Sequence, residues 1–388
     1  MATRDTEVVQ QIVEEIRRRV LDVIGDNNVR CVFVSGSVSR DEVTAHESDG
    51  VIELYSDVDI GIVVSSSVDT QAAKERIRRE IARIPREGNA FHMYAPPDVG
   101  VYRVDEMMRQ KARPGTVNFG GAKILYGEPD IVTDAAISIG TNIDPGEALY
   151  LIENRLNESA EAERMLTDDA TRGQIRYATY IGLKCYLDIA TAVLIVLGRY
   201  RDTRSERMEA LEDPLVRSEM LSIIGDEVAA EIRQCWLALQ DLSGFFTRIS
   251  GNERAFFSTI YRALAHSWRG VALRAYGSTE KEWAELLHRR TRYGKQLRNT
   301  RELLALARRM GWGGPRLYRR LFELRMVSGV ELLRMTSLLE GVKEGADDKT
   351  RHFVNEICVP CLEVLTHLGG ISNGQVFERG RALNRAIS

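Results

Sequence analysis

The chain has few of the residues that mark a disulfide-stapled protein or a zinc finger. Its five cysteines are an odd number, scattered over 388 residues at positions 31, 185, 235, 358 and 361. Such scatter is not a disulfide framework and favours a reducing compartment. Cys358 and Cys361 form a single Cys-x-x-Cys pair with no second pair and no histidine at a standard zinc spacing. We therefore interpret this pair as helix-packing residues rather than as a metal or redox site.

Long apolar runs are also missing. The longest, residues 181–197, contains Lys184 and Asp188 and is too short and too charged for a membrane span. The N-terminus is charged from residue 4 onward and has no apolar core of signal-peptide type. We therefore expect a cytoplasmic protein that does not cross a membrane.

The sequence lacks a dominant charge and several well-known catalytic motifs. Its net charge is -3, which gives no global attraction to nucleic acid. Lysine is scarce, with 8 residues against 45 arginines, a bias that we attribute to genome base composition. There is no Gly-x-Ser-x-Gly, no P-loop and no His-Glu-x-x-His sequence. The absence of these motifs argues against a P-loop ATPase and a zinc protease.

Hydrophobic periodicity divides the chain into an N-terminal α+β part and a helical remainder. Helices are predicted over residues 5–24 and 70–84, and strands near 29–34, 58–64 and 98–103, with 91–94 as a further short strand. Residues 120–127 are expected to close this part of the chain. Asp144-Pro145 has the residues of a helix start, and no alternating strand pattern follows. We expect a mixed-sheet domain at 1–143, a helical domain at 144–276 and a second helical domain at 277–388.

Two short motifs carry most of the functional information. Residues 32–37 read Val-Phe-Val-Ser-Gly-Ser, a buried strand followed by the turn Gly36-Ser37. Asp57 and Asp59 then stand two residues apart at a second apolar strand, so alternation places both carboxylates on one face. Two such carboxylates are tolerable mainly with a cation between them, and a Gly-Ser turn lets backbone N–H groups approach an anion. A metal site beside a phosphate-binding turn is suited to phosphoryl or nucleotidyl transfer.

This combination resembles the polymerase-β-like nucleotidyltransferase superfamily over roughly residues 25–130. The resemblance implies that Gly36 and Ser37 bind the triphosphate of a nucleotide, ATP or another NTP, and that three carboxylates hold two Mg²⁺ ions. The 19 residues between Ser37 and Asp57 exceed the usual gap. They resemble a subgroup with a Gly-Ser-x-x-Arg-x-Glu start and a polar loop before the aspartates, which makes Arg40 a further nucleotide-binding candidate.

The third carboxylate expected from the resemblance is assigned to Asp98. It follows Pro96-Pro97 at the start of the strand predicted near 98–103. Asp105 and Glu106 are alternatives, but they precede Met107-Met108 and have the pattern of a helix start. A loop carboxylate without a catalytic role is the other interpretation of Asp98.

The helical part contributes one candidate phosphate contact. Lys184 and Asp188 lie four residues apart on the most apolar predicted helix, so they share one face. A lysine from a helical domain often reaches the triphosphate in the superfamily, which makes Lys184 a candidate. The alternative is that Lys184 and Asp188 satisfy each other.

The acceptor is less well defined by the sequence. A small molecule is the leading expectation, because no RNA-binding module is visible. The arginine-rich stretch 288–325 supports tRNA as an alternative, although a solvated helix face explains it as well. A protein side chain as acceptor and a nucleotide-binding scaffold without turnover are further alternatives, and residues 276–388 could serve in oligomerisation.

Overall fold

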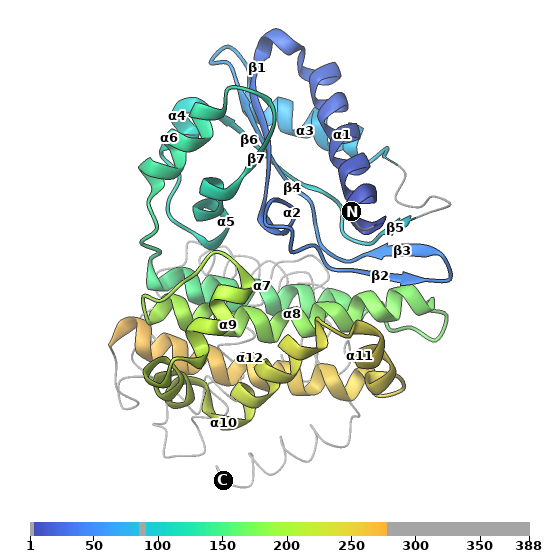
Figure 1. Cartoon of the computed structure of the whole chain (residues 1–388), viewed down its shortest axis with the longest axis vertical. Helices are drawn as coiled ribbons and strands as arrows, with labels where there is room; N and C mark the ends of the chain where they lie inside the picture. Colours follow the sequence, from blue (N-terminus) through green and yellow to red (C-terminus); the bar gives the residue numbers. More distant parts are fainter. Residues whose placement is uncertain (1–3, 85–90, 278–388) are drawn as a thin grey trace, which may run out of the picture. The chain divides into compact units, whose positions relative to one another are not determined.

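The computed structural model describes residues 4–84 and 91–277, and these form two compact units (Figure 1). The described part of the first unit runs to Glu147 and also includes Leu197–Glu212 and Leu239–Gly244. The second comprises Ala148–Val196, Asp213–Ala238 and residues 245–277. Two short segments from the later part of the sequence therefore belong to the same unit as the Gly-Ser turn and the aspartates.

A four-stranded mixed sheet is the centre of the first unit. Its strands are β1 (Val29–Ser35), β4 (Asp59–Val64), β6 (Asp98–Arg103) and β7 (Lys123–Gly127), in the order β6-β4-β1-β7. β1 is antiparallel to both β4 and β7, whereas β4 and β6 are parallel. The strands predicted near 29–34, 58–64 and 98–103 are confirmed to within one residue at each end, whereas β7 was not predicted as a strand.

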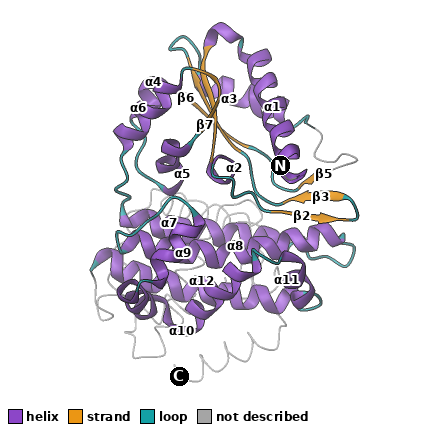
Figure 2. Ribbon diagram, viewed as in Figure 1, coloured by secondary structure: helices purple, strands orange, loops and turns teal. Residues whose placement is uncertain are grey.

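One face of this sheet is covered by α1 (Arg4–Ile24) and α3 (Thr70–Ile81), which lie on the same side of it (Figure 2). The Asp69 carboxylate caps α3 by accepting the N–H groups of Gln71 and Ala72. The helices and alternate strand residues form one apolar core, which includes Val8, Ile12, Ile16, Val20, Val32, Val34, Ile60, Ile62, Ala73, Ile77, Val99 and Val101.

The opposite face is covered by α4 (Val104–Met108), the 3-10 turn η2 (Asn118–Gly121) and α6 (Pro129–Ile139). Phe33 is fully buried here and meets Phe119 edge-on, with 5.2 Å between the ring centroids. Gly61 stands beside Gly100 in the parallel register. The rings of Phe33 and Tyr102 occupy the space that side chains at these two glycines would need.

Two strands of a second sheet form within the segment expected to be a polar loop. β2 (Ala45–Ser48) and β3 (Val51–Leu54) make a hairpin, and β5 (Phe91–Met93) pairs with β3 in parallel. The two-residue turn Asp49-Gly50 has positive φ at both positions, 54° and 77°, as a type I′ turn requires. The polar-loop prediction is therefore wrong for this segment.

The second unit is built from helices. Its main elements are α7 (Pro145–Glu163), α8 (Arg172–Val196), α10 (Pro214–Ala238) and α12 (Glu253–Tyr276), and α10 changes direction at Gly225. α8 packs on α10 and α12. Trp268 on α12 is fully buried and donates its Nε1–H to Glu153 of α7 at 3.0 Å.

The remaining short elements of the described chain are η1 (Asp26–Asn28), α2 (Gly36–Ser39), α5 (Pro114–Val117), α9 (Arg204–Glu212) and α11 (Leu242–Ile249).

The expected α+β class is observed in the described residues, with helices alone following Pro145. α8 passes a length and hydropathy test for a membrane span, but 78% of the apolar window is buried within the structure. That burial is also expected of a core helix. Three predictions fall on residues 278–388, outside the described part: the second helical domain, the arginine-rich stretch 288–325 and the pair Cys358 and Cys361.

Candidate active site

The Gly-Ser turn follows directly from the end of β1. Gly36 has φ 65°, a conformation that L-residues adopt at a cost, and it opens the short helical turn α2. The Ser39 hydroxyl donates to the Gly36 carbonyl at 3.1 Å, and the Glu42 N–H donates to the Ser37 carbonyl at 2.8 Å. These bonds fix the loop between β1 and β2 at its first turn.

Asp59 lies against this turn. It is the first residue of β4 and stands opposite Ser35, the last residue of β1, in the antiparallel register. A Cβ built on Gly36 would overlap the Asp59 carboxylate at Oδ2. Glycine at position 36 is thus required both by its backbone conformation and by the carboxylate that packs on it.

The backbone brings Asp98 beside Asp59. Asp98 is the first residue of β6, and its Cα is the parallel partner of Asp59. Side chains at directly opposed positions of neighbouring strands project from the same face. Asp57 lies two residues before β4 begins, so strand alternation does not fix its direction as the sequence suggested. Asp57 and Asp59 are both half-buried.

The Asp98 carboxylate turns toward α3. Its Oδ1 accepts the Val99 N–H at 2.9 Å and lies 3.6 Å from Arg78 Nη2. Its side chain is 72% exposed. Within residues 4–84 and 91–277, no three His, Cys, Asp or Glu side chains gather closely enough to hold a metal ion. The backbone therefore aligns two of the three predicted carboxylates, while the Asp98 side chain engages other partners.

The alternatives to Asp98 act as helix-start residues, as their pattern indicated. The Glu106 carboxylate accepts the Arg103 N–H at 2.9 Å at the start of α4. Asp105 pairs with Arg109 one turn later at 2.5 Å. Both acids are engaged within or next to their own short helix.

Two buried polar atoms on the Gly-Ser loop have no hydrogen-bond partner among the described residues. They are Ser37 Oγ, on a residue that is 8% exposed, and Arg40 Nη1. A buried donor without a protein partner is available to a bound ligand or to water, because leaving it unpaired costs free energy. Together with hard carboxylate oxygens at Asp57, Asp59 and Asp98, the residues fit an anion bound with Mg²⁺.

Arg40 is held by a network that the sequence did not indicate. Its Nε donates to Glu42 Oε2 at 2.9 Å, and both side chains are 14% exposed. The second Glu42 oxygen accepts the backbone N–H of Arg204, the first residue of α9. Arg204 also donates to the buried Thr44 hydroxyl at 3.0 Å. Arg204 is 162 positions from Glu42, and no local pattern in the sequence signals this contact.

Tyr102 is a second residue that sequence reasoning missed. Its hydroxyl lies over Gly100, on the strand face that alternation also assigns to Asp98. Burial raises the pKa of Tyr102, and the nearby charges of Asp98 and Asp59 raise it further. The spacing 98, 100, 102 would have revealed this shared face.

Lys184 lies on α8 in the second unit and is partly buried. Asp188 forms an ion pair with Arg155 of α7, a residue that also pairs with Glu158. The sequence had offered Lys184 as the partner of Asp188. A contact between Lys184 and phosphate stays a prediction.

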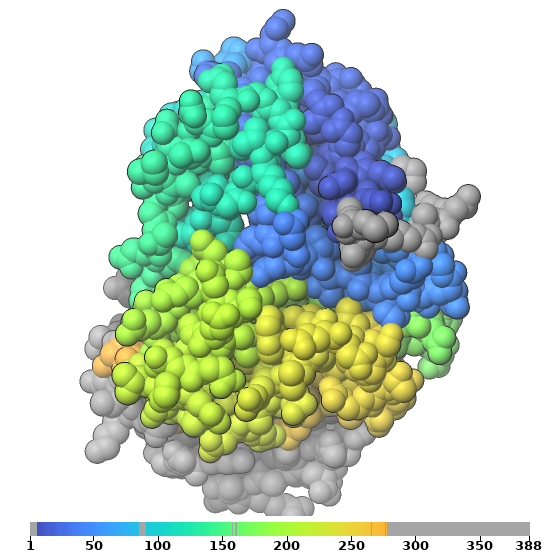
Figure 3. All heavy atoms as spheres, in the orientation of Figure 1, coloured from blue at the N-terminus to red at the C-terminus, as the bar shows by residue number. Residues whose placement is uncertain are grey.

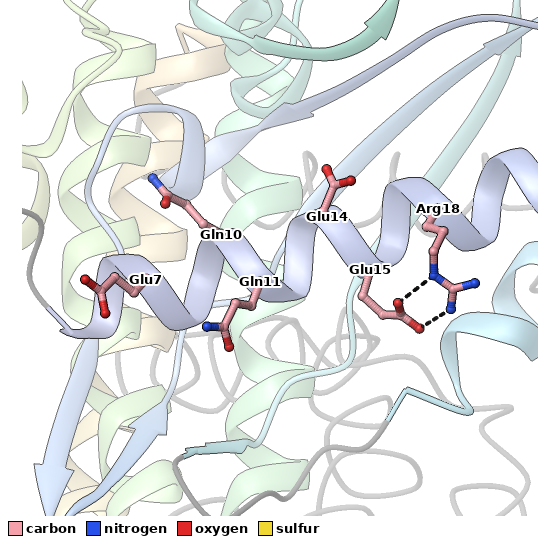
Figure 4. Close-up of a pocket in the computed structure, with 6 residues that line it drawn as sticks. All are labelled: Glu7, Gln10, Gln11, Glu14, Glu15 and Arg18. Carbon is pink, nitrogen blue, oxygen red and sulfur yellow. Dashed lines mark hydrogen bonds and ion pairs between the residues drawn. The ribbon is translucent and has the colours of Figure 1, made fainter.

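Residues of α1, dark blue in Figure 3, lie at the surface of the first unit. A shallow hollow lies along the outer face of this helix. Its lining residues all come from this one helix, and Glu15 and Arg18 are engaged with each other (Figure 4). They are Glu7, Gln10, Gln11, Glu14, Glu15 and Arg18. Side chains from one helix cannot surround a ligand, so we assign no site to this hollow.

We compared the sequence with protein-family models and with curated proteins. No protein-family model matches the sequence, and no curated protein matches it.

Proposed function

We propose that the first unit is a nucleotidyltransferase domain of the polymerase-β-like type. It would bind an NTP with Mg²⁺ and transfer the NMP group to an acceptor hydroxyl or phosphate. The proposal is supported by the order strand, Gly-Ser turn, acid-bearing strand and second acid-bearing strand in one mixed sheet.

One observation carries the proposal. The Asp59 carboxylate packs directly on Gly36, where a Cβ would overlap it. The Asp59 carboxylate repels the anion that such a turn attracts, unless a cation joins the carboxylate and the anion. Their direct contact is the arrangement that a metal–triphosphate complex needs.

Each residue has a distinct part in this account. The Gly36-Ser37 turn and Arg40 would bind the β- and γ-phosphates, with Ser37 Oγ and Arg40 Nη1 as donors. Asp57, Asp59 and Asp98 would hold two Mg²⁺ ions, which screen the charge of the triphosphate and of the attacking oxygen when bound. Lys184 is a further candidate for the phosphates. Positioning and charge compensation would provide most of the rate enhancement.

The reaction is an in-line displacement at the α-phosphorus. An acceptor oxygen forms the new P–O bond as the bond to the β-phosphate oxygen breaks, and pyrophosphate leaves. The proton of an acceptor hydroxyl passes to the Asp98 carboxylate or to water. We favour a small-molecule acceptor. Transfer to tRNA would rely on the stretch 288–325, outside the described residues, and a protein acceptor is the remaining alternative.

A nucleotide-binding scaffold without turnover is the second candidate. The position of the Asp98 carboxylate, bonded to Val99 and close to Arg78, favours it. That ion pair is exposed on both sides, however, and exposed pairs contribute only about 0–1 kcal/mol. A divalent cation between the carboxylates would compete with it readily.

Transfer of label from α-³²P-labelled NTPs tests the proposal and separates the acceptors. Each NTP is incubated with Mg²⁺ and either a fraction of small metabolites or purified tRNA. We expect label in the small-molecule fraction, and none from Asp59→Asn protein with an unchanged circular dichroism spectrum. Label on RNA would establish the tRNA alternative. Near wild-type transfer by Asp59→Asn would exclude the assignment, and retention of all label in NTP with every pool would favour the scaffold.

A further inference from the structure

We propose that Glu42 is a positioning residue that couples the start of α9 to the nucleotide site by holding Arg40. The inference rests on the proposed function, because it concerns the same triphosphate site. It adds to that site the segment Leu197–Glu212, which belongs to the first unit although its neighbours in the sequence do not.

The contacts of Glu42 form a bridge. One carboxylate oxygen accepts from Arg40 Nε at 2.9 Å, and the other accepts the backbone N–H of Arg204. Both Arg40 and Glu42 are 14% exposed, so the pair is shielded from water more than a surface ion pair. Charge-assisted hydrogen bonds at this depth fix the direction of the guanidinium plane. The Nη1 atom of Arg40 is buried and donates no hydrogen bond within the described part of the chain, while the charge of Asp202, in the 197–212 segment, also acts on Arg40.

The start of α9 is built to present its N–H to Glu42. Thr203 and Glu206 form a capping box, in which the Glu206 N–H donates to Thr203 Oγ1 and the Thr203 N–H donates to Glu206 Oε2. Arg204 is the first helical residue, and its N–H is one of the groups that a helix leaves without an internal partner. The negative Glu42 carboxylate satisfies it and interacts favourably with the helix dipole.

The 197–212 segment is tied to the first unit at further points. Arg204 donates to the hydroxyl of the buried Thr44 at 3.0 Å. The Thr44 N–H in turn donates to Ser56 Oγ at 2.8 Å, and Ser56 directly precedes Asp57. The Tyr200 hydroxyl donates to the Pro114 carbonyl at 3.4 Å. The segment thus contacts the loop that carries Arg40 and, through Thr44, the approach to the aspartates.

The mechanism predicted from these contacts is specific to the terminal phosphates. With Glu42 neutral or α9 displaced, Arg40 loses the partner that orients it, and Nη1 no longer meets the phosphate. Affinity for Mg²⁺–NTP should fall, whereas affinity for the corresponding NMP should not change. A purely structural role for Glu42 would instead lower stability and affect both nucleotides equally.

Calorimetric titration of the full chain with Mg²⁺–NTP and with NMP tests this inference. For Glu42→Gln we expect NTP affinity to fall about tenfold, the size of effect given by one lost charge-assisted hydrogen bond. In an Arg40→Ala background the same substitution should cause no further loss, because Glu42 acts through Arg40. Glu128→Gln is the matched control: it removes the same charge from an exposed pair with Arg30 and should not change the affinity.

A second pair of variants addresses the backbone contact. Arg204→Pro removes the N–H at a first helical position, which accepts proline, whereas Arg204→Ala keeps it. Both remove the bond to Thr44, so their difference isolates the bond to Glu42. We expect weaker NTP binding from Arg204→Pro than from Arg204→Ala, even if Glu42→Gln fails to fold.

The outcomes separate this inference from the proposed function. Wild-type binding with the same NTP affinity in Glu42→Gln, or in Arg204→Pro and Arg204→Ala, overturns the inference and leaves the proposed function standing. A loss of affinity that is additive with Arg40→Ala also overturns it. Wild-type protein that binds no NTP removes the proposed function and this inference together.

Discussion

Gly36 is the single residue on which the candidate site depends most. Its φ of 65° is in the left-handed region, and the Asp59 carboxylate occupies the space that a side chain would need. A positive φ costs any L-residue free energy, whereas the overlap with the Asp59 carboxylate is particular to position 36. The two contributions can be separated, because Gly50 has a positive φ of 77° with nothing within 4 Å of a built Cβ.

Alanine at the two glycines should therefore differ in effect. For Gly50→Ala we expect a loss of about 1–2 kcal/mol in the free energy of unfolding, from the left-handed conformation alone. Gly36→Ala should lose about 1–3 kcal/mol more, since a new methyl group must displace a packed side chain. Urea unfolding measures both. Equal losses would contradict the packing of Asp59 on Gly36.

Arg78 provides a second test at this scale. It lies 3.6 Å from Asp98 and competes with a metal ion for that carboxylate. Arg78→Gln should therefore strengthen Mg²⁺ binding about two- to fivefold at low salt, the effect of removing one nearby exposed cation. Mg²⁺ titration without nucleotide measures this. The control is Arg109→Gln, which removes a cation from the exposed pair of Arg109 with Asp105. Weaker Mg²⁺ binding by Arg78→Gln would contradict the assignment of Asp98.

At the scale of elements, the pairing of β4 with β6 forms the part of the sheet that follows Asp59 and Asp98 along the two strands. Gly61 and Gly100 are direct partners, and their missing side chains make room for the rings of Phe33 and Tyr102. Asp59 and Asp98 are the first residues of these two parallel strands, so the rings lie on the sheet face that follows the acids along each strand. The two rings also explain why β4 and β6 carry glycine at these positions, where an apolar residue would favour the sheet.

Substitution at this contact should be non-additive. Gly61→Ala places a methyl group against the Phe33 ring and should cost about 1–3 kcal/mol. Phe33→Leu removes the ring, so the two substitutions together should cost less than the sum of the single losses. A cycle of urea denaturation curves measures the coupling. Additive losses would show that the ring does not fill the glycine gap.

The elements differ in how far the sequence predicted them. The core strands were predictable because their residues alternate or form apolar runs, and α3 because Asp69 caps an amphipathic pattern. The β2–β3 hairpin was missed although Asp49-Gly50 is a strong turn signal, because a polar loop was expected from the resemblance. The contact of Glu42 with Arg204 had no local signal, since periodicity carries no information about pairs 162 residues apart.

The site residues divide in the same way. The proximity of Asp59 to Gly36 and to Asp98 was expected from the resemblance, and it arises from a strand order and register that the residue pattern alone did not predict. The direction of the Asp98 carboxylate was not expected, because it depends on Arg78 from α3 and on rotamers that a pattern of residues does not encode. Tyr102 was predictable from alternation alone and was overlooked.

Considered as a whole molecule, the chain combines a unit with sheets and a unit of helices, and the stability of the helical unit has a component that is lost as the pH rises. Glu163 of α7 accepts from the Tyr261 hydroxyl at 2.7 Å. Burial raises the pKa of this carboxyl above its ordinary value of 4.5, against the opposing effects of Tyr261 and Arg254. The proton therefore binds more tightly in the folded state. The stabilisation that comes from this tighter proton binding is complete below pH 4.5 and is lost as the pH rises through the folded-state pKa of Glu163.

Glu163→Gln should consequently raise the urea midpoint at pH 7, because the amide keeps an acceptor for Tyr261 without a buried charge. The gain should shrink toward pH 4, where the wild-type carboxyl is protonated. Glu227→Gln, at an exposed position on α10, is the control and should leave the midpoint unchanged. A lower midpoint for Glu163→Gln at pH 7 would show that the ionised carboxylate is stabilising.

The central claim is that Asp57 and Asp59 bind an NTP through Mg²⁺ at the Gly36-Ser37 turn. The most direct measurement is calorimetric titration with each of the four NTPs, with and without Mg²⁺, of wild type and of the Asp57→Asn/Asp59→Asn double variant. The account predicts Mg²⁺-dependent binding by wild type that the double variant loses while remaining folded. Binding that survives both substitutions, or no binding of any NTP by wild type, would contradict it.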